Sequence, residues 1–303
     1  MISIIVSARN LKQQASNCLA GLLESIRPLG IEQSVEYVLV DDASDAGSEI
    51  VPLFLDFRSH TKSKVQILRF RARQHYSRGL AYAFSAAHGD SLLFVSHDMV
   101  ATPSYFRAIL GVAALDSSIG LVRGTSPYVD CFPEHVIPLP VRPRGLTELF
   151  RFAEFVHDQY GLSFVEDRLL TGDSMLIKRG VIDKIGVFDP RYFGYFGDID
   201  FGLRLQRAGF KMVCAKGAWL LHEGAAYYKH LDGGVDFPGA VKDRMKVVQA
   251  AYEAFREKWG RFLPEIYPGT ANIDFAKLRE VPTPSGGEFQ PAMQMDHAIV
   301  EIL

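Results

Sequence analysis

The stretch VEYVLVDDAS, residues 35–44, decides how the rest of this sequence is interpreted. Apart from Glu36, its first six residues are apolar, which is typical of a strand buried on both faces of a parallel sheet. Asp41 and Asp42 follow directly. Open parallel sheets bind ligands beyond the carboxyl ends of their strands, so the stretch predicts a strand that carries two carboxylates to a binding edge. Aspartate is also favoured in turns and helix caps, and that structural role is the alternative for both residues.

Similar apolar runs lie on both sides of this stretch and alternate with helical periodicity. Further strands are predicted at residues 2–7, 65–70 and 91–96. Helices are predicted at residues 11–26, 48–58 and 77–88. Repeated strand–helix–strand units with apolar strands predict an α/β fold with a mostly parallel central sheet flanked by helices.

The pattern changes after residue 124. Residues 125–170 are predicted to form a long irregular insertion with one helix at 147–160, and such insertions are frequently binding loops. Later strands are expected at residues 174–178, 212–215 and 218–222, and later helices from about Asp198 to Gly209 and at 241–259. The tail after Pro264 is rich in Pro, Gly and Ser, and we expect it to wrap around the domain or to be partly disordered.

The composition is that of an ordinary globular enzyme, with 303 residues of which 48% are hydrophobic and 22% charged. A formal net charge of -2 creates no general attraction for nucleic acid, so no nucleic-acid partner is expected. The three cysteines, Cys18, Cys131 and Cys214, form no CxxC pair. Neither a zinc site nor a disulfide framework is therefore predicted, and buried free thiols are the better interpretation.

The first eight residues are apolar but lack the basic start and small-residue cleavage site of a signal peptide. No apolar run approaches the length that spans a bilayer. We therefore expect a cytoplasmic protein. Contact with the inner face of the membrane and formation of a homodimer both stay open.

Polar residues at other strand ends extend the predicted binding edge. For a nucleotide-bearing donor, Asp41 and Asp42 are candidates to contact the nucleoside, and the arginines are candidates to bind phosphate, because guanidinium groups pair with it closely. The remaining donor-binding candidates are Ser7, Arg9, Asn10, Arg71, Arg78 and His97. The alternative for the basic residues between Arg71 and Arg78 is a solvated helix start, and the alternative for His97 is a surface position. Lys229 and His230 are candidates for a mobile lid over the donor.

Asp98 and His222 are the candidate metal ligands, each at the end of a predicted strand. A hard cation, Mn²⁺ or Mg²⁺, binds oxygen ligands and stabilises a departing diphosphate. A helix cap is the alternative for Asp98, since Pro103 begins a predicted helix. A structural histidine is the alternative for His222.

Asp198 is the candidate general base, which would take the proton of an acceptor hydroxyl so that attack inverts the anomeric carbon. The alternative is a helix cap, and Asp200 has a structural alternative in an ion pair with Arg204 one turn later. The aromatic run at residues 192–196, which includes Tyr195 and Phe196, predicts a stacking wall for a sugar or ordinary packing.

The order of these motifs resembles glycosyltransferase family 2, the inverting enzymes with the GT-A (nucleotide-diphospho-sugar transferase) fold. The matching stretches are SIIVS (3–7), VDDAS (40–44), FVSHD (94–98), GDSMLIKR (172–179), IGVFD (185–189), YFGDIDFGLR (195–204), AGFK (208–211), His222 and FREKWG (255–260). Together they cover residues 1–260. Each motif is short, and the ordered set carries the specificity.

The resemblance implies a role for each matching residue. Asp41 would contact the base of the donor, and Asp98 would be the last acid of a DxD-like metal motif. Asp198 would be the catalytic base, and His222 would contact the metal or the diphosphate. Gly172, Asp173, Tyr195, Phe196 and Asp200 would line the acceptor site. The implied domain spans residues 1–262, with a nucleotide-binding half (1–100) and an acceptor-binding half (101–262), followed by the tail at 263–303.

Three departures from the family pattern limit what the resemblance implies. Ser96 stands at the first acid of the metal motif, Gly197 precedes the predicted base where an acid is usual, and Gln74-His75 replaces an Asn-Gly signature. The expected donor is a UDP-, dTDP- or GDP-sugar, and the acceptor a saccharide or glycolipid. A non-catalytic saccharide-binding relative is one alternative. A nucleotidyltransferase is another, although the first strand is not followed by a glycine-rich phosphate loop.

Overall fold

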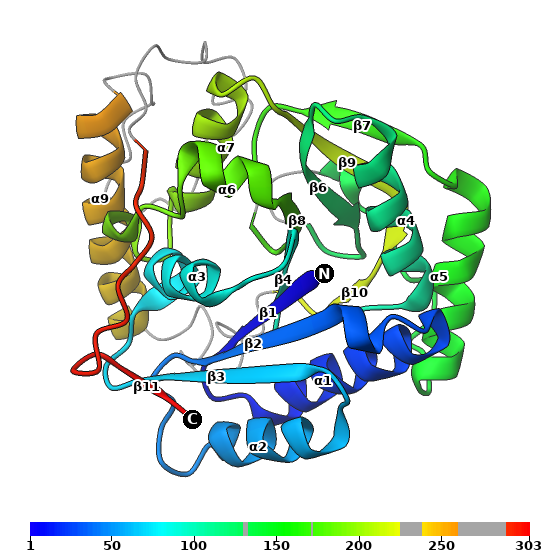
Figure 1. Cartoon of the computed structure of the whole chain (residues 1–303), viewed down its shortest axis with the longest axis horizontal. Coiled ribbons are helices and arrows are strands. Elements are labelled where there is room, and N and C mark those ends of the chain that lie inside the picture. The colour runs from blue at the N-terminus through cyan, green and yellow to red at the C-terminus, as the bar shows by residue number, and fades with distance from the viewer. Residues whose placement is uncertain (130–132, 171, 225–237, 260–288) are drawn as a thin grey trace.

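Figure 1 shows the computed structural model of the chain, a central sheet with helices on both faces. The structure describes residues 1–129, 133–170, 172–224, 238–259 and 289–303, and in the last helix the side chains from Lys246 onward. Among these residues, nine strands form one sheet in the spatial order β11-β3-β2-β1-β4-β8-β6-β9-β7.

The first third of the chain builds the parallel part of the sheet. Its strands are β1 (Ile2–Ala8), β2 (Val35–Asp41), β3 (Lys64–Phe70) and β4 (Ser91–Ser96). The connecting helices are α1 (Lys12–Ile26), α2 (Ile50–His60) and α3 (His75–Ala86). All pairings among these four strands are parallel. The predicted α/β fold with a mostly parallel central sheet is confirmed.

The second half of the sheet is mixed. Its strands are β6 (Ile119–Thr125), β7 (Phe164–Asp167), β8 (Ser174–Lys178) and β9 (Lys211–Trp219). β8 runs antiparallel between β4 and β6, β9 runs parallel to β6, and β7 runs antiparallel to β9. A two-stranded sheet of β5 (Met99–Val100) and β10 (Leu221–His222) lies beside it.

β6 and β7 are among the strands that the sequence did not predict. β6 carries two glycines and Arg123, which hide its apolar pattern, and β7 has only four residues, three of them exposed. The predicted division of residues 212–222 into two sheet strands was also wrong, because β9 continues through Gly217 to Trp219. A side chain at Gly217 would overlap the Gly161 carbonyl, so this glycine serves close packing within the strand.

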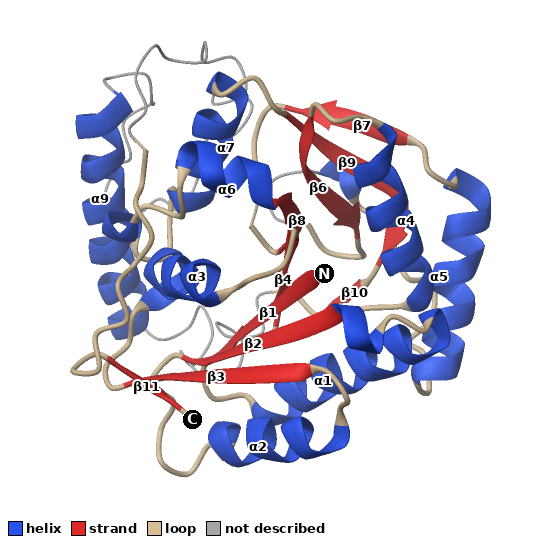
Figure 2. Ribbon diagram, viewed as in Figure 1, coloured by secondary structure: helices blue, strands red, loops and turns tan. Residues whose placement is uncertain are grey.

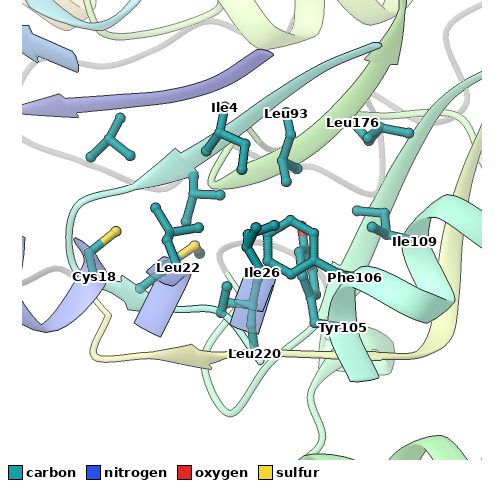
Figure 3. Close-up of a cluster of buried hydrophobic side chains, with 14 of the residues drawn as sticks. Ile4, Cys18, Leu22, Ile26, Leu93, Tyr105, Phe106, Ile109, Leu176 and Leu220 are labelled. Atoms are coloured by element: carbon teal, nitrogen blue, oxygen red, sulfur yellow. The ribbon is translucent and has the colours of Figure 1, made fainter. Parts of the chain in front are cut away.

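The core lies on both faces of the sheet. Ile4 packs with α1, α2 and α4 (Pro103–Leu115), whereas Ile5 packs with α3, α6 (Arg179–Ile185) and α7 (Gly197–Arg207). Neighbouring residues of a strand point to opposite faces, so both faces of β1 are covered (Figure 2). Figure 3 shows Leu22 and Ile26 of α1 pointing toward Phe106 of α4 in the first of these clusters. Cys18 and Cys214 are buried free thiols, and Cys131 lies outside the described residues.

Two further helices complete the fold. α5 (Leu146–Tyr160) packs on Trp219 of β9. α9 (Pro238–Trp259) packs through a separate apolar cluster against α7 and the short helix η4 (Pro190–Tyr192). The predicted tail is ordered at its end, because β11 (Val300–Ile302) adds antiparallel to β3, while residues 260–288 lie outside the described part. None of the described helices has the length and apolarity that crossing a bilayer requires.

Candidate active site

The loops after β1 and β2 are joined to each other at the carboxyl edge of the sheet. The Arg9 guanidinium donates to the carbonyls of Asp42 and Ala43, at 3.1 and 2.8 Å. The Asn10 side chain exchanges two hydrogen bonds with Asp45, of 2.8 and 2.9 Å. Arg9 and Asn10 therefore hold the two loops together, and they do so at the edge where a ligand was predicted.

Asp41 and Asp42 are both buried and already bonded within the protein. Asp41 accepts a 2.9 Å hydrogen bond from the Ser44 amide. Asp42 accepts from the amides of Gln74 and His75, at 2.5 and 3.1 Å, and so caps the start of α3. Burial raises the pKa of Asp42, although these amides and nearby arginines lower it in part. The contacts of Asp42 are those of a helix cap, which was the structural alternative for this residue. Asp41 and Asp42 both lie at the carboxyl edge of the sheet, as predicted.

A basic cluster surrounds the start of α3. Burial, followed by the charges of Arg73, Arg9 and Arg78, lowers the pKa of His75 to about 4. Arg78 lies over the Phe193 ring at 5.6 Å. Since His75 is neutral at pH 7, the positive charge of this cluster resides on the arginines. Arg71 points elsewhere, because its side chain donates to the His297 carbonyl at 3.4 Å.

His97 and Ser7 meet at the ends of β4 and β1. The His97 ring bonds the Ser7 backbone, and burial lowers the pKa of His97. Its Nε2 atom is buried without a hydrogen-bond partner in the described part of the chain. A buried unpaired nitrogen is costly, so this atom is a candidate contact for a bound ligand.

Asp98, just before β5, and His222, at the end of the neighbouring strand β10, face each other. Asp98 Oδ1 accepts a 2.7 Å bond from the Ser96 hydroxyl, and Asp98 Oδ2 lies 3.5 Å from His222 Nε2. His222 Nδ1 lies 2.9 Å from the Tyr128 carbonyl. Burial opposes ionisation of both groups. His222, and to a smaller degree His97 and the Ser96 hydroxyl, nevertheless hold the pKa of Asp98 well below its usual range. Asp98 and Asp173, together with the Tyr128 carbonyl, raise the pKa of His222.

Asp173 extends this constellation. Its carboxylate lies 3.8 Å from His222 Nδ1 and 3.2 Å from the Arg123 guanidinium, which is almost fully buried on β6. Its backbone carbonyl accepts from the Ser96 amide at 3.1 Å. Asp173 is thus fixed beside the predicted metal ligands, although the resemblance implied an acceptor contact for it.

Asp198 begins α7. Its Oδ2 accepts from the Gly172 amide at 3.2 Å and its Oδ1 from the Ile199 amide at 2.9 Å. Burial raises the pKa of Asp198 to about 6, the charge of Asp173 adds to the rise, and the amide bonds oppose it. A carboxylate with this pKa is suited to take a proton near neutral pH.

The segment Gly172–Asp173 brings the two distant aspartates together. The Gly172 amide donates to Asp198, and the next residue, Asp173, lies beside His222, which faces Asp98. The Gly172 carbonyl accepts a 2.6 Å bond from the Tyr76 hydroxyl. A side chain at Gly172 would overlap that hydroxyl, so only glycine fits here. Asp98 and Asp198 therefore belong to one site.

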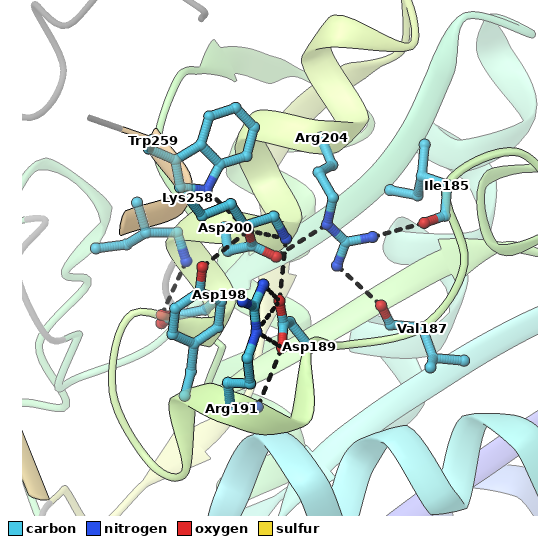
Figure 4. A network of polar contacts seen from close by, with 11 residues as sticks. Ile185, Val187, Asp189, Arg191, Asp198, Asp200, Arg204, Lys258 and Trp259 are labelled. Atoms are coloured by element: carbon cyan, nitrogen blue, oxygen red, sulfur yellow. Dashed lines mark hydrogen bonds and ion pairs between the residues drawn. The ribbon is translucent and has the colours of Figure 1, made fainter. Parts of the chain in front are cut away.

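Two of the predicted acceptor residues, Asp200 and Phe196, are buried, and a third, Tyr195, lies beside them. Asp200 has no exposed surface and bonds Arg204, Trp259 and Tyr192 (Figure 4). Phe196 is buried against Tyr252 and Phe255 of α9. These positions do not fit acceptor contacts for Asp200 and Phe196, because both side chains are buried within the protein. Tyr195 remains partly exposed in the same turn.

The geometry of Asp98 and His222 fits a divalent cation. Asp98 Oδ2 and His222 Nε2 form an ion pair at 3.5 Å, and this separation also lies within the roughly 3–4 Å between neighbouring ligands held at about 2.1 Å from one ion. With the Nδ1 hydrogen on the Tyr128 carbonyl, Nε2 is left as a metal ligand, a usual arrangement for metal-bound histidine. No group of three or more His, Cys, Asp or Glu side chains suited to a metal occurs among the described residues.

Tyr76, Arg123 and Tyr128 were not predicted as site residues. Tyr76 orients Gly172, Arg123 fixes Asp173, and the Tyr128 carbonyl orients His222. An arginine inside the strand of residues 119–125 was the one available signal, because a buried arginine needs an anionic partner. The predicted lid residues Lys229 and His230 lie outside the described residues.

Curated proteins match parts of this chain. The chain is 41% identical over 56 residues to an N-acetylglucosaminyl-diphospho-decaprenol L-rhamnosyltransferase of Mycobacterium tuberculosis, which is 18% of each protein. It is 26% identical over 160 residues to the O-antigen biosynthesis protein RfbC of Myxococcus xanthus, which is 48% of this chain and 12% of that protein. The chain thus spans less than a fifth of the length of these relatives.

Solved structures share the fold. The mannosyltransferase PcManGT from Pyrobaculum calidifontis, in complex with GDP-Man and Mn²⁺, matches with a TM-score of 0.53 at 14% identity, over 84% of this chain and 74% of that one. GalNAc-T7 with UDP, GalNAc and Mn²⁺ matches with a TM-score of 0.53 at 12% identity, over 86% and 50%. These neighbours are glycosyltransferases with the predicted GT-A fold.

The family model described as "Glycosyltransferase like family 2" matches residues 1–249, which include every candidate site residue named above. The match covers more than half of the chain, and it agrees with the ordered motifs and with the fold. The chain belongs to glycosyltransferase family 2.

Proposed function

We propose that this protein is an inverting, metal-dependent glycosyltransferase that uses Asp198 as its general base. It moves a sugar from a nucleotide-diphosphate sugar to a hydroxyl of a saccharide or glycolipid acceptor. The observation that carries the proposal is the convergence of Asp198 and the Asp98–His222 pair on the segment Gly172–Asp173. A base on one side and a cation site on the other are what inverting transfer requires.

Asp198 performs the proton transfer in this mechanism. At pH 7 most of its carboxylate is ionised, because its pKa is about 6. One carboxylate oxygen accepts the proton of the acceptor hydroxyl while that oxygen attacks the anomeric carbon from the side opposite the diphosphate. The Gly172 and Ile199 amides orient the carboxylate without neutralising it.

Asp98 and His222 would hold Mn²⁺ or Mg²⁺ in this proposal. A cation there would supply positive charge to stabilise the departing nucleoside diphosphate. Arg9 and Arg78 lie at the same edge of the sheet and would bind the donor. Ser96 replaces an acid but bonds Asp98, so it orients the one carboxylate that remains.

The relatives suggest which donors to try first. Their names mention L-rhamnosyl transfer, GDP-Man, and UDP with GalNAc. Transfer of a hexosyl group and transfer of an N-acetylhexosaminyl group are both consistent with our proposal. Cytoplasmic location, membrane contact and homodimer formation stay predictions.

The test measures released nucleoside diphosphate with Mn²⁺ and dTDP-L-rhamnose, GDP-mannose or UDP-N-acetylgalactosamine. Asp98→Asn should need a higher Mn²⁺ concentration for half-maximal rate, whereas Asp198→Asn should stay inactive at any Mn²⁺ concentration. The control is Asp158→Asn, on the exposed face of α5, which should behave as wild type. An unchanged Mn²⁺ dependence of Asp98→Asn would refute the assignment of Asp98 as a metal ligand. Full activity of Asp198→Asn would refute the assignment of Asp198 as the base. Donor binding without any turnover would favour a non-catalytic saccharide-binding relative.

A further inference from the structure

The first turn of α7 has two aspartates with opposite surroundings. Asp198 lies at the candidate site, whereas Asp200 has no exposed surface and points into the protein. Because the two residues share one helical turn, a displacement of Asp200 moves Asp198 as well. The contacts of Asp200 therefore decide where the candidate base sits.

α9 supplies two of those contacts. Lys258 Nζ lies 2.7 Å from Asp200 Oδ1, and Trp259 Nε1 donates to the same oxygen at 2.8 Å. Both side chains are almost fully buried. Lys258 Nζ also lies 3.1 Å from Asp189 Oδ2, so one ammonium group bridges two buried carboxylates (Figure 4). The bridge ties α9 to the start of α7 and to the loop before η4.

The backbone that leads into Asp198 needs such support. Phe193 and Phe196 have positive φ angles of 51° and 62°, a region that bulky residues rarely adopt. Phe196 directly precedes α7 and packs on Tyr252 and Phe255 of α9. A strained turn persists only when surrounding contacts hold it. α3 holds Phe193, through the ring contact of His75 and the Ser77 amide, and α9 holds Phe196, the residue next to α7.

We infer that α9, through Lys258 and Trp259, positions the catalytic turn and so sets the orientation of Asp198. Both residues belong to the stretch FREKWG (255–260), which lies beyond residue 249, where the match to the family model ends. Neither touches a substrate in this arrangement, so they are positioning residues. The inference rests on the proposed role of Asp198 as base.

Lys258 can be removed without leaving a buried carboxylate unpaired. Asp200 keeps Arg204, whose Nε lies 2.9 Å away, and Asp189 keeps Arg191 at 2.8 Å. A Lys258→Met variant is therefore expected to fold. The loss of the ammonium group should instead shift the turn that carries Asp198. This separates positioning from a general loss of stability.

The test compares Lys258→Met with Val248→Ala, which opens a small cavity elsewhere on α9 and leaves the polar bridge intact. Nucleoside diphosphate release is measured with Mn²⁺ and whichever of the three nucleotide sugars wild type uses best. Lys258→Met should lower kcat about tenfold or more and change the donor KM less than twofold. Val248→Ala should lower the melting temperature and leave kcat unchanged.

Trp259→Phe provides a second variant, because it removes one hydrogen bond to Asp200 and keeps Lys258. It should lower kcat severalfold with the donor KM unchanged, and it decides the matter if Lys258→Met does not fold. A folded variant of either residue with wild-type kcat overturns the inference, as does an equal fall in kcat in Val248→Ala. Absence of turnover in wild type would instead count against the proposed function.

Discussion

Replacing Asp198 with asparagine should remove activity and at the same time make stability less sensitive to pH. Burial raises the pKa of this carboxyl from 3.8 to about 6. The folded state therefore holds the proton more tightly than the unfolded state. The resulting stabilisation is fully present below the unfolded pKa and is lost as pH rises through the folded value.

The size of the effect follows from that shift. A difference of about two pKa units corresponds to about 3 kcal/mol over the full titration, and to about 2 kcal/mol between pH 4 and pH 8. Wild type should lose this much stability over the interval through Asp198 alone, and Asp198→Asn should not. The free energy of unfolding of Asp198→Asn minus that of wild type should thus increase with pH.

The absolute stability of Asp198→Asn is less informative than its pH dependence. Asparagine has one carbonyl oxygen, so it cannot accept from both the Gly172 and Ile199 amides, and the lost hydrogen bond costs about 1–3 kcal/mol at every pH. Urea unfolding of both proteins at pH 4, 6 and 8 separates the two effects. If the difference in unfolding free energy between the two proteins stays constant across these pH values, the burial argument for Asp198 is refuted.

Three further predictions concern the residues around this carboxylate. Gly197→Ala should abolish turnover and lower the melting temperature, because the new Cβ would overlap the Ser77 hydroxyl and lie 2.9 Å from Ser77 Cβ; wild-type melting would contradict this. Asp200→Asn should cost about 3–5 kcal/mol in urea unfolding, since it leaves the buried Arg204 cation without its anion, and a change below 1 kcal/mol would return Asp200 to the list of acceptor contacts. Arg123→Met should leave Asp173 without its arginine partner. Nucleoside diphosphate release at limiting Mn²⁺ should then fall by about tenfold or more. Unchanged release would show that Asp173 does not need Arg123.

The sequence predicted the parallel half of the fold well because its signals are local. Each strand there is a short apolar run, and each is followed by a helix of regular period. The second half was predicted less well. β6 contains glycines and an arginine, and β7 is short and exposed, so their strand character comes from neighbours in the sheet rather than from their own pattern.

The candidate site divides in the same way. Asp98, Asp198 and His222 could be chosen from sequence because each follows a strand or begins a helix in an ordered series of motifs. The partners that tune them come from remote segments, as Tyr76 does for Gly172 and Lys258 does for Asp200. No spacing rule links residues so far apart in the chain.

What the sequence determined by itself is the set of strands and helices in the first hundred residues and the chemical groups at their ends, because periodicity and capping act over a few residues. Tertiary structure alone decided which carboxylate lies at the candidate site and which is fully enclosed among buried cations. Asp198 and Asp200 are two residues apart with the same side chain, yet one accepts from the Gly172 amide and the other bonds buried cations. Their surroundings differ because α9 packs behind the turn, and packing between distant segments sets the desolvation and the charge that each carboxylate experiences.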